Sequence, residues 1–397
     1  MNTTHEQVKA WDQQYHVPTY GRFDAVLVSG KGAVAVDANG KEYIDFGAGI
    51  GVNALGYCDE GWARAVSEQA GRLQHCSNLY YNDAQATLVR DLCEATGFSR
   101  AFLCNSGAEA NECAVKIARK YSFDRYGAGR DRIVTLKNSF HGRTVTTLAA
   151  TGQDSFHQYF YPFTEGFVYA EAGNLQDVAD KAGDTACAVL LEPIQGEGGV
   201  VPLDSEFVRA VAELCRQKDM LLLFDEVQTG VGRTGTLYAW EQFGVRPDVV
   251  TSAKGLAGGL PFGACLCAPK AAPVLGAGMH GSTFGGNPIA SAAASYVLSR
   301  VNTPAFLEDV RRKGEWLRGE LAAMPGVRSV RGLGLMLGLE LDGASAREVA
   351  AQCIEQGLLI LTAKELLRLL PPLNITMDEL RRGTAVLRKV LSECAGS

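Results

Sequence analysis

Short apolar runs alternate with amphipathic segments through the middle of the chain. The apolar runs favour buried strands, and the segments between them favour helices. The expected strands are Arg100–Cys104, Arg132–Leu136, Phe167–Ala170, Ala186–Leu191, Met220–Phe224, Asp248–Thr251 and Gly263–Ala268. The expected helices are Glu109–Tyr121, Leu175–Ala182 and Ser205–Gln217. This alternation predicts an α/β fold with right-handed crossovers and a mostly parallel seven-stranded sheet.

The two ends of the chain have a different pattern. Residues Ala33–Phe46 predict a hairpin with Asp37-Ala38-Asn39-Gly40 as its turn. After Gly285-Gly286-Asn287-Pro288, the pattern predicts a long helical stretch, short strands around Val327–Leu341 and then two further helices. We therefore expect a small α+β domain that is built from both termini.

The length of the chain predicts two domains. At 397 residues it is longer than one compact core usually holds. The prediction places an N-terminal arm and part of the small domain in residues 1–45, the large domain in residues 46–288, and the rest of the small domain in residues 289–397.

Composition and charge narrow the class of protein. The net charge of −6 leaves no basic stripe for the phosphates of a nucleic acid. No apolar stretch is long enough to span a bilayer, and Met1–Gln14 lack an apolar signal core, so we expect a cytoplasmic protein. The eleven cysteines contain no Cys-x-x-Cys pair, which predicts buried, reduced thiols and no metal site.

Titratable side chains follow two of the apolar runs. Asp225 comes after Leu221–Phe224, and Lys254 follows the run that contains Val249 and Val250. In open parallel sheets, ligands bind outside the carboxyl ends of the strands, where burial tunes the charge of a side chain. Pyridoxal phosphate requires such a lysine for a Schiff base and such a carboxylate for its pyridine nitrogen. Two charged residues alone still permit several chemistries.

Three other strand ends carry compatible residues. Asn105-Ser106-Gly107-Ala108-Glu109 has capping-box spacing, which predicts either free amides for a phosphate or an ordinary capped helix. Phe140 and Arg143 could stack on a flat ring and clamp a carboxylate, although core packing and a surface ion pair explain each of them alone. Glu192 and Glu197 lie in a Gly-rich loop that either faces the ligand crevice or is solvated surface.

Two patterns that resemble nucleotide-binding motifs occur without the second motif that each of them requires. The apolar run that ends in Asp225-Glu226 resembles the magnesium-holding strand of a nucleotide hydrolase, but the chain has no Gly-x-x-x-x-Gly-Lys-Ser/Thr loop. Gly230, Gly232 and Gly235 form a Gly-x-Gly-x-x-Gly pattern, but no ribose-binding acid is clearly placed after it. We therefore do not expect a nucleotide hydrolase or a nicotinamide dehydrogenase.

Taken together, the motifs resemble those of the class III (subgroup II) aminotransferases, which are pyridoxal-phosphate enzymes of fold type I. The matching stretches are Cys104–Glu112, Phe140–Thr144, Glu192–Glu197, Phe224–Gly230, Ser252–Lys254 and Gly281–Pro288. The resemblance extends from about Tyr20 to the C-terminus. The chain departs from the family at Asp59-Glu60, where His-Pro is usual, and at Phe284, where tyrosine is more usual.

The resemblance implies roles in a cofactor site. Lys254 would form the internal Schiff base with pyridoxal 5′-phosphate, and Asp225 would pair with the pyridine nitrogen. Phe140 and Val227 would pack on opposite faces of the ring, and Gln228 would lie near its hydroxyl group. The other cofactor-binding residues would be Ser106, Gly107, Ala108 and Glu192, together with Thr283 from the neighbouring subunit of a homodimer.

The same resemblance implies a ping-pong transamination with two substrates. Arg143 would bind the carboxylate distal to the reacting amine, and Arg368 the α-carboxylate of 2-oxoglutarate or glutamate. Glu197 would pair with Arg368 when the amino donor is bound, and Tyr20 and Ser282 would also contact substrate. The flanking stretches are most similar to the branch that converts N2-acetylornithine to N-acetylglutamate 5-semialdehyde in arginine biosynthesis. Succinylornithine, ornithine, succinyldiaminopimelate and 4-aminobutyrate are the alternative donors.

Overall fold

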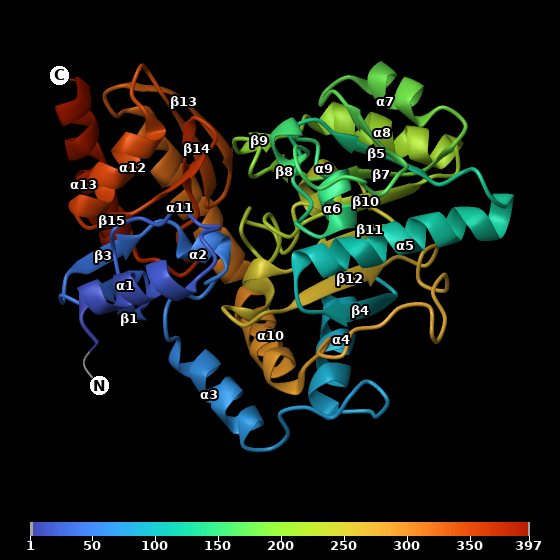
Figure 1. Ribbon diagram of the computed structural model, residues 1–397, viewed down its shortest axis with the longest axis horizontal. Coiled ribbons are helices and arrows are strands. Elements are labelled where there is room, and N and C mark those ends of the chain that lie inside the picture. Colours follow the sequence, from blue (N-terminus) through green and yellow to red (C-terminus); the bar gives the residue numbers. More distant parts are fainter. Residues whose placement is uncertain (1–2, 396–397) are drawn as a thin grey trace.

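The computed structural model describes residues 3–395, and its centre is a seven-stranded sheet (Figure 1). In their order across the sheet, the strands are β4 (Arg100–Cys104), β12 (Gly263–Cys267), β11 (Val249–Ser252), β10 (Leu221–Asp225), β7 (Ala186–Leu191), β5 (Arg132–Leu136) and β6 (Phe167–Ala170). Neighbouring strands are parallel from β11 to β6, whereas β12 is antiparallel to β11 and to β4. The predicted mostly parallel sheet is therefore confirmed.

The two strands that lead to Asp225 and Lys254 each extend one residue beyond the predicted end. β10 includes Asp225, which pairs with Thr251 in the parallel ladder, and β11 ends at Ser252, which pairs with Ala264. The prediction ended these strands at Phe224 and Thr251 because it followed side-chain polarity, whereas the ladder is made by the backbone. The backbone of Asp225 is consequently fixed within the sheet.

Helices cover both faces of this sheet. Alternate side chains of a strand point to opposite faces, so Leu190 and Leu223 pack in the cluster formed with α5, whereas Leu191 and Phe224 pack in the larger cluster on the other face. The helices in this part of the chain are α2 (Ala48–Gly51), α3 (Glu60–Ala70), α4 (Asp83–Thr96), α5 (Gly107–Tyr126), α6 (Val145–Ala150), α7 (Leu175–Ala182), α8 (Ser205–Gln217), α9 (Trp240–Phe243) and α10 (Pro288–Val301).

A second group of elements is built from both ends of the chain, as predicted. The hairpin of β2 (Val34–Asp37) and β3 (Glu42–Asp45) has the predicted turn, in which the Gly40 amide donates to the Asp37 carbonyl oxygen (3.0 Å). β15 (Leu358–Leu359) pairs in parallel with β3 and so joins the C-terminal region to this hairpin. Residues 1–2 and 396–397, at the ends of the predicted terminal segments, lie outside the described residues.

A four-stranded sheet, β13-β14-β17-β16, completes this second group. The prediction anticipated strands around Val327–Leu341 but missed the β16–β17 pair, which brings Arg368 into the sheet. The remaining elements are α1 (His5–Tyr15), β1 (Leu27–Lys31), β8 (Ile194–Gln195), β9 (Val201–Pro202), α11 (Pro304–Ala322), β13 (Val327–Leu333), β14 (Met336–Leu341), α12 (Ala346–Glu355), β16 (Leu361–Ala363), β17 (Leu366–Leu369) and α13 (Met377–Ala395). None of the helices within residues 3–395 is both long and apolar enough to cross a membrane.

Candidate active site

A cavity of about 440 Å³ opens at the carboxyl ends of the central parallel strands. The loops that follow β5, β7, β10 and β11 all contribute to its wall, together with the start of α5. The predicted site residues that line it are Ser106, Gly107, Ala108, Phe140, Arg143, Glu192, Asp225, Val227, Gln228 and Lys254. The fold thus gathers side chains that are far apart in the sequence at the edge where ligands bind in such sheets.

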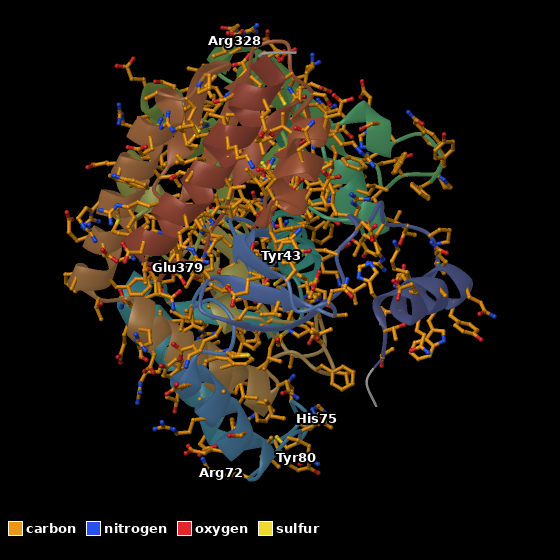
Figure 2. The ribbon with its side chains drawn as sticks, turned by 90° about the vertical axis from the view of Figure 1, so that its left-hand side faces the viewer. Tyr43, Arg72, His75, Tyr80, Arg328 and Glu379 are labelled. Atoms are coloured by element: carbon orange, nitrogen blue, oxygen red, sulfur yellow. The ribbon has the colours of Figure 1, made fainter. Side chains whose placement is uncertain are left out.

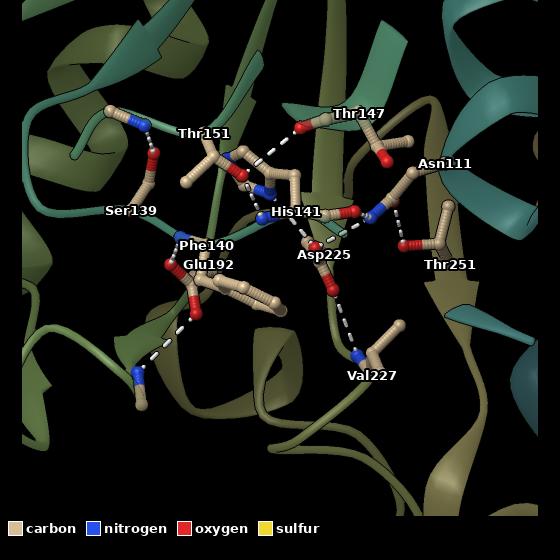
Figure 3. A network of polar contacts seen from close by, with 12 residues as sticks. Asn111, Ser139, Phe140, His141, Thr147, Thr151, Glu192, Asp225, Val227 and Thr251 are labelled. Carbon is tan, nitrogen blue, oxygen red and sulfur yellow. Dashed lines mark hydrogen bonds and ion pairs between the residues drawn. The ribbon is translucent and has the colours of Figure 1, made fainter. Parts of the chain in front are cut away.

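Asp225 is held by three neighbours at the end of β10 (Figure 3). Asn111 Nδ2 donates to its Oδ2 (2.8 Å), and His141 Nδ1 lies 2.8 Å from the same oxygen. The backbone amide of Val227 donates to Oδ1 (3.0 Å). Thr251 Oγ1 in turn donates to the Asn111 side-chain oxygen (2.7 Å). This buried network fixes the orientation of the Asp225 carboxylate beside the cavity.

The start of α5 presents free backbone amides to the cavity. Ser106 caps the helix by accepting from the Glu109 amide (3.2 Å), but Glu109 accepts from the Asn105 amide (2.8 Å), one residue before the capping-box position. The amides of Gly107 and Ala108 have no acceptor in the described part of the chain. Two free amides at the N-terminus of a 20-residue helix form an anion site.

Two glycines allow this helix start to approach its neighbours. A Cβ on Gly107 would lie 2.7 Å from the Val227 methyl carbons, and a Cβ on Gly142 would lie 2.8 Å from the Ala108 Cβ. Gly142 also has a φ of +138°, which favours glycine. The loop that carries Phe140, the start of α5 and the loop after Asp225 therefore pack directly against one another.

Lys254 is the first residue after β11 and Ala253, at the start of the 3-10 turn Lys254–Ala257. Its φ of +43° is in the left-handed region, where a residue with a side chain is strained by about 1–3 kcal/mol. Burial lowers the pKa of the Lys254 amine below its ordinary value. The amine has no hydrogen bond or ion pair with another described residue. It is therefore available as a nucleophile or a base.

Glu192 connects two of the loops at the cavity. One carboxyl oxygen accepts from the Phe140 amide (2.9 Å) and the other from the Gly196 amide (3.3 Å). Burial, followed by the charge of Asp225, raises the pKa of Glu192 well above its ordinary value. A protonated Glu192 can donate a hydrogen bond to a ligand in the cavity as well as accept one.

An ion pair between the buried Arg368 and the partly exposed Glu197 lies beside the cavity. Arg368 Nη1 donates to Glu197 (2.5 Å) and to the side-chain oxygen of Gln228 (3.2 Å), which lines the cavity. Burial raises the pKa of Glu197, but the charge and hydrogen bond of Arg368, together with Lys254 and Gln228, outweigh burial, so the pKa lies below its ordinary value. Arg368 Nε is buried without a partner in the described chain. This guanidinium thus retains a free donor for a ligand.

Comparison with known proteins shows the family. The sequence matches the family described as Aminotransferase class-III over residues 15–391. The chain belongs to the class III aminotransferases. Enzymes of this family depend in general on pyridoxal phosphate. No cluster of three or more His, Cys, Asp or Glu side chains within residues 3–395 could hold a metal ion.

Full-length relatives of this aminotransferase have names from two related activities. An acetylornithine aminotransferase of Haemophilus ducreyi is 51% identical over 392 residues, which are 98% of this chain and 100% of that protein. An ornithine aminotransferase from Toxoplasma gondii ME49 is 33% identical, with a TM-score of 0.95 over 99% of this chain and 96% of that chain. An N-acetylornithine aminotransferase from Stenotrophomonas maltophilia K279a is 38% identical, with a TM-score of 0.85 over 98% and 99% of the two chains. These neighbours confirm the predicted fold class.

Besides Glu197 and Arg368, which lie beside the cavity, three predicted site residues of the aminotransferase do not line it. Tyr20 is 69% exposed and lies beside His16, and Thr283 is also exposed. Ser282 Oγ accepts from Asn105 Nδ2 (2.9 Å), so it is close to the α5 start without lining the cavity. A single chain therefore does not bring these residues to Lys254.

Sequence reasoning missed two of the residues that hold Asp225. Asn111 lies on the same face of α5 as Gly107, one turn later, which is the signal that could have revealed it. His141 directly follows Phe140 in a motif from which only the aromatic ring and the arginine were interpreted. The contacts with Asp225 cross 114 and 84 residues of the sequence, so the fold is needed to show that both side chains meet the same carboxylate.

Glu226 follows Asp225 and is fully buried. It accepts from the backbone amides of Ala239 and Trp240 (both 2.7 Å) and from Thr229 Oγ1 (2.9 Å). Burial raises the pKa of Glu226 to about 7, and these donors oppose the shift. Glu226 therefore fixes the loop that follows Asp225.

We expect Glu226 to lower the free energy of unfolding as the pH rises from about 4.5 to about 7. Between these values the folded state holds a proton that the unfolded state has lost, so stability is greatest below the unfolded pKa. The difference between the folded and unfolded pKa of Glu226 corresponds to about 3 kcal/mol in the free energy of unfolding. Unfolding of the wild type and Glu226→Gln across this range tests it. The stability of the wild type relative to the variant should fall by this amount, and a constant difference would contradict the prediction.

Proposed function

We propose that this enzyme transfers the amino group of N2-acetylornithine to 2-oxoglutarate, a step of arginine biosynthesis. The observation that carries the proposal is the pair of guanidinium groups near Lys254, since Arg368 is paired with Glu197 whereas Arg143 has no ion pair in the described chain. One site must accept a donor with a single carboxylate and an acceptor with two. An arginine with a built-in carboxylate partner meets that requirement.

Pyridoxal phosphate fits the residues of the cavity. The free amides of Gly107 and Ala108 suit its phosphate, the unpaired Lys254 amine suits its aldehyde, and the fixed carboxylate of Asp225 suits its pyridine nitrogen. Phe140 and Val227 would pack on its ring. When bound, the cofactor supplies an electron sink for the substrate carbon that loses a proton. Ser106, Gln228 and Glu192 complete the proposed cofactor-binding set.

Lys254 is the proposed acid–base residue. Its lowered pKa favours the neutral amine, which can accept the proton from the substrate carbon and return it at a neighbouring atom. Burial excludes competing water and keeps the amine in place. The two half-reactions use one site in turn, so ping-pong kinetics are expected.

The two arginines divide the recognition of substrates. Arg143 would bind the carboxylate distal to the reacting amine in both substrates. Arg368 would bind the α-carboxylate of 2-oxoglutarate after Glu197 moves away. With N2-acetylornithine bound, the ion pair between Arg368 and Glu197 would remain intact, because leaving the buried Arg368 charge without a partner costs about 3–5 kcal/mol.

We further propose a homodimer in which Thr283 reaches the phosphate bound by the neighbouring subunit. Thr283 precedes the exposed Phe284, whose ring lies 5.5 Å from that of His75. Leu79 and Tyr80, which are 88% and 70% exposed, belong to the same surface, and Figure 2 shows His75 and Tyr80 together at one end of the molecule. An exposed apolar surface of this kind is typical of an interface. A second copy would bring Thr283 to a site that one chain leaves incomplete.

Amino donors supplied one at a time to the purified enzyme test the substrate. N2-acetylornithine should convert the cofactor from its aldehyde form to its amine form with the highest kcat/KM, measured from the absorbance of the cofactor. Ornithine, succinylornithine, succinyldiaminopimelate and 4-aminobutyrate are the comparison donors. A markedly higher kcat/KM for any of them would overturn the substrate assignment while leaving the aminotransferase activity intact.

A further inference from the structure

Arg143 is exposed, yet two aromatic rings hold its guanidinium. Its Cζ lies 4.4 Å from the centre of the Phe156 ring and 5.4 Å from that of the Phe140 ring. The two rings lie 5.8 Å apart in an edge-to-face arrangement. Arg143 has no ion pair or hydrogen bond with another described residue. The contact with Phe156 is therefore the closest interaction that orients its head group.

The segment around Phe156 is anchored on both sides. Phe156 ends the 3-10 turn Asp154–Phe156, and Gln153 before it donates through Nε2 to the carbonyl oxygen of Ser139 (3.0 Å), the residue before Phe140. His157 after it lies 3.0 Å from the Leu148 carbonyl oxygen through Nε2, and its ring contacts two other aromatic rings. Phe156 is thus a fixed ring and not part of a free loop.

An aromatic ring orients an arginine without occupying its donors. A ring attracts the face of the guanidinium, whereas the N–H groups lie in the plane of that group and point away from its face. A carboxylate partner would instead take those donors and compete with the substrate. Phe156 is also absent from the lining of the cavity, so it acts through Arg143 and not on the substrate.

We propose that Phe156 is a positioning residue that orients Arg143 for the substrate carboxylate. This inference rests on the proposed role of Arg143 in the transamination. Restricting a long, flexible side chain before binding reduces the entropy lost when the substrate binds. The affinity for donors that carry the distal carboxylate therefore depends on a residue that the substrate does not contact.

Phe156→Leu tests this, because leucine keeps an apolar side chain and removes the aromatic face. We expect the KM for N2-acetylornithine to rise about two- to fivefold, as the loss of one exposed cation–π contact implies, with little change in kcat. N-Acetyl-1,4-diaminobutane, the same donor without its carboxylate, should react equally with the wild type and the variant. Phe156→Tyr, which keeps the aromatic face, should restore the KM. Phe156→Met replaces the leucine variant if that variant does not fold.

A double-mutant cycle with Arg143→Gln separates positioning from a structural role. In the Arg143→Gln background, Phe156→Leu should have no further effect on KM for N2-acetylornithine. An undiminished effect there, or an equal loss with the carboxylate-free donor, would overturn the role of Phe156. Failure of Arg143→Gln itself to weaken N2-acetylornithine would instead refute the proposed role of Arg143. The two proposals therefore fail by different results.

Discussion

Lys254→Ala is expected to lower kcat by about 10⁴-fold or more, because the variant loses both the nucleophile and the base of the proposed reaction. The anion site at the start of α5 and the Asp225 network do not include Lys254, so the cofactor should still bind. Turnover with N2-acetylornithine and 2-oxoglutarate measures the first effect. The absorbance of cofactor that stays with the variant after gel filtration measures the second. Borohydride treatment followed by intact mass should leave covalently fixed cofactor on the wild type only, because Lys254 is the proposed point of attachment.

A second lysine provides the control for this experiment. Lys137 follows β5 near the same edge of the sheet, but it is exposed and pairs with Glu171. Lys137→Ala should therefore leave kcat unchanged. A small primary amine added to Lys254→Ala should restore part of the activity, because it supplies the missing base. Turnover by Lys254→Ala above about one hundredth of the wild-type rate would contradict the assignment.

The sheet, and the site residues at its carboxyl edge, could be predicted from the sequence because both follow from local patterns. Each buried strand appears as an apolar run, and in a parallel sheet the residues after such runs gather at one edge. Asp225 and Lys254 could therefore be placed at this edge from the order of the residues alone. The limits of the strands were less accurate where a polar residue, such as Asp225 or Ser252, continues the backbone ladder.

Residues whose position depends on tertiary contacts could not be placed from local patterns. Arg368 lies within the apolar strand Leu366–Leu369, and its partner Glu197 is 171 residues away in the sequence. The resemblance to a family, and not the pattern itself, assigned both. Phe156 gave no signal, because its contact with Arg143 arises from the fold of an irregular segment. The proposed role of Thr283 would depend on a second copy of the chain, which no pattern within one chain can report.

Arg368→Ala is expected to raise the KM for 2-oxoglutarate by about 100-fold or more, and the KM for N2-acetylornithine far less. Hydrogen bonds to charged groups each contribute about 1.5–3 kcal/mol, and the guanidinium would make two of them to the α-carboxylate. N2-acetylornithine has no carboxylate at that position, so it loses only the local order that the Arg368–Glu197 pair provides. Initial rates at varied concentrations of each substrate give both constants.

Glu197→Gln should shift the preference between the two substrates in the direction opposite to Arg368→Ala, toward the substrate with two carboxylates. The variant keeps the size of the side chain but removes the charge that holds Arg368, so only neutral hydrogen bonds, such as the one to Gln228, hold the guanidinium. Glutamate and 2-oxoglutarate should then bind at least as tightly as in the wild type, and glutamate should compete more strongly with N2-acetylornithine as the donor. Equal effects of either substitution on the two substrates would show that the pair only stabilises the fold. Opposite effects would instead establish it as the element that lets one site accept substrates with one and two carboxylates.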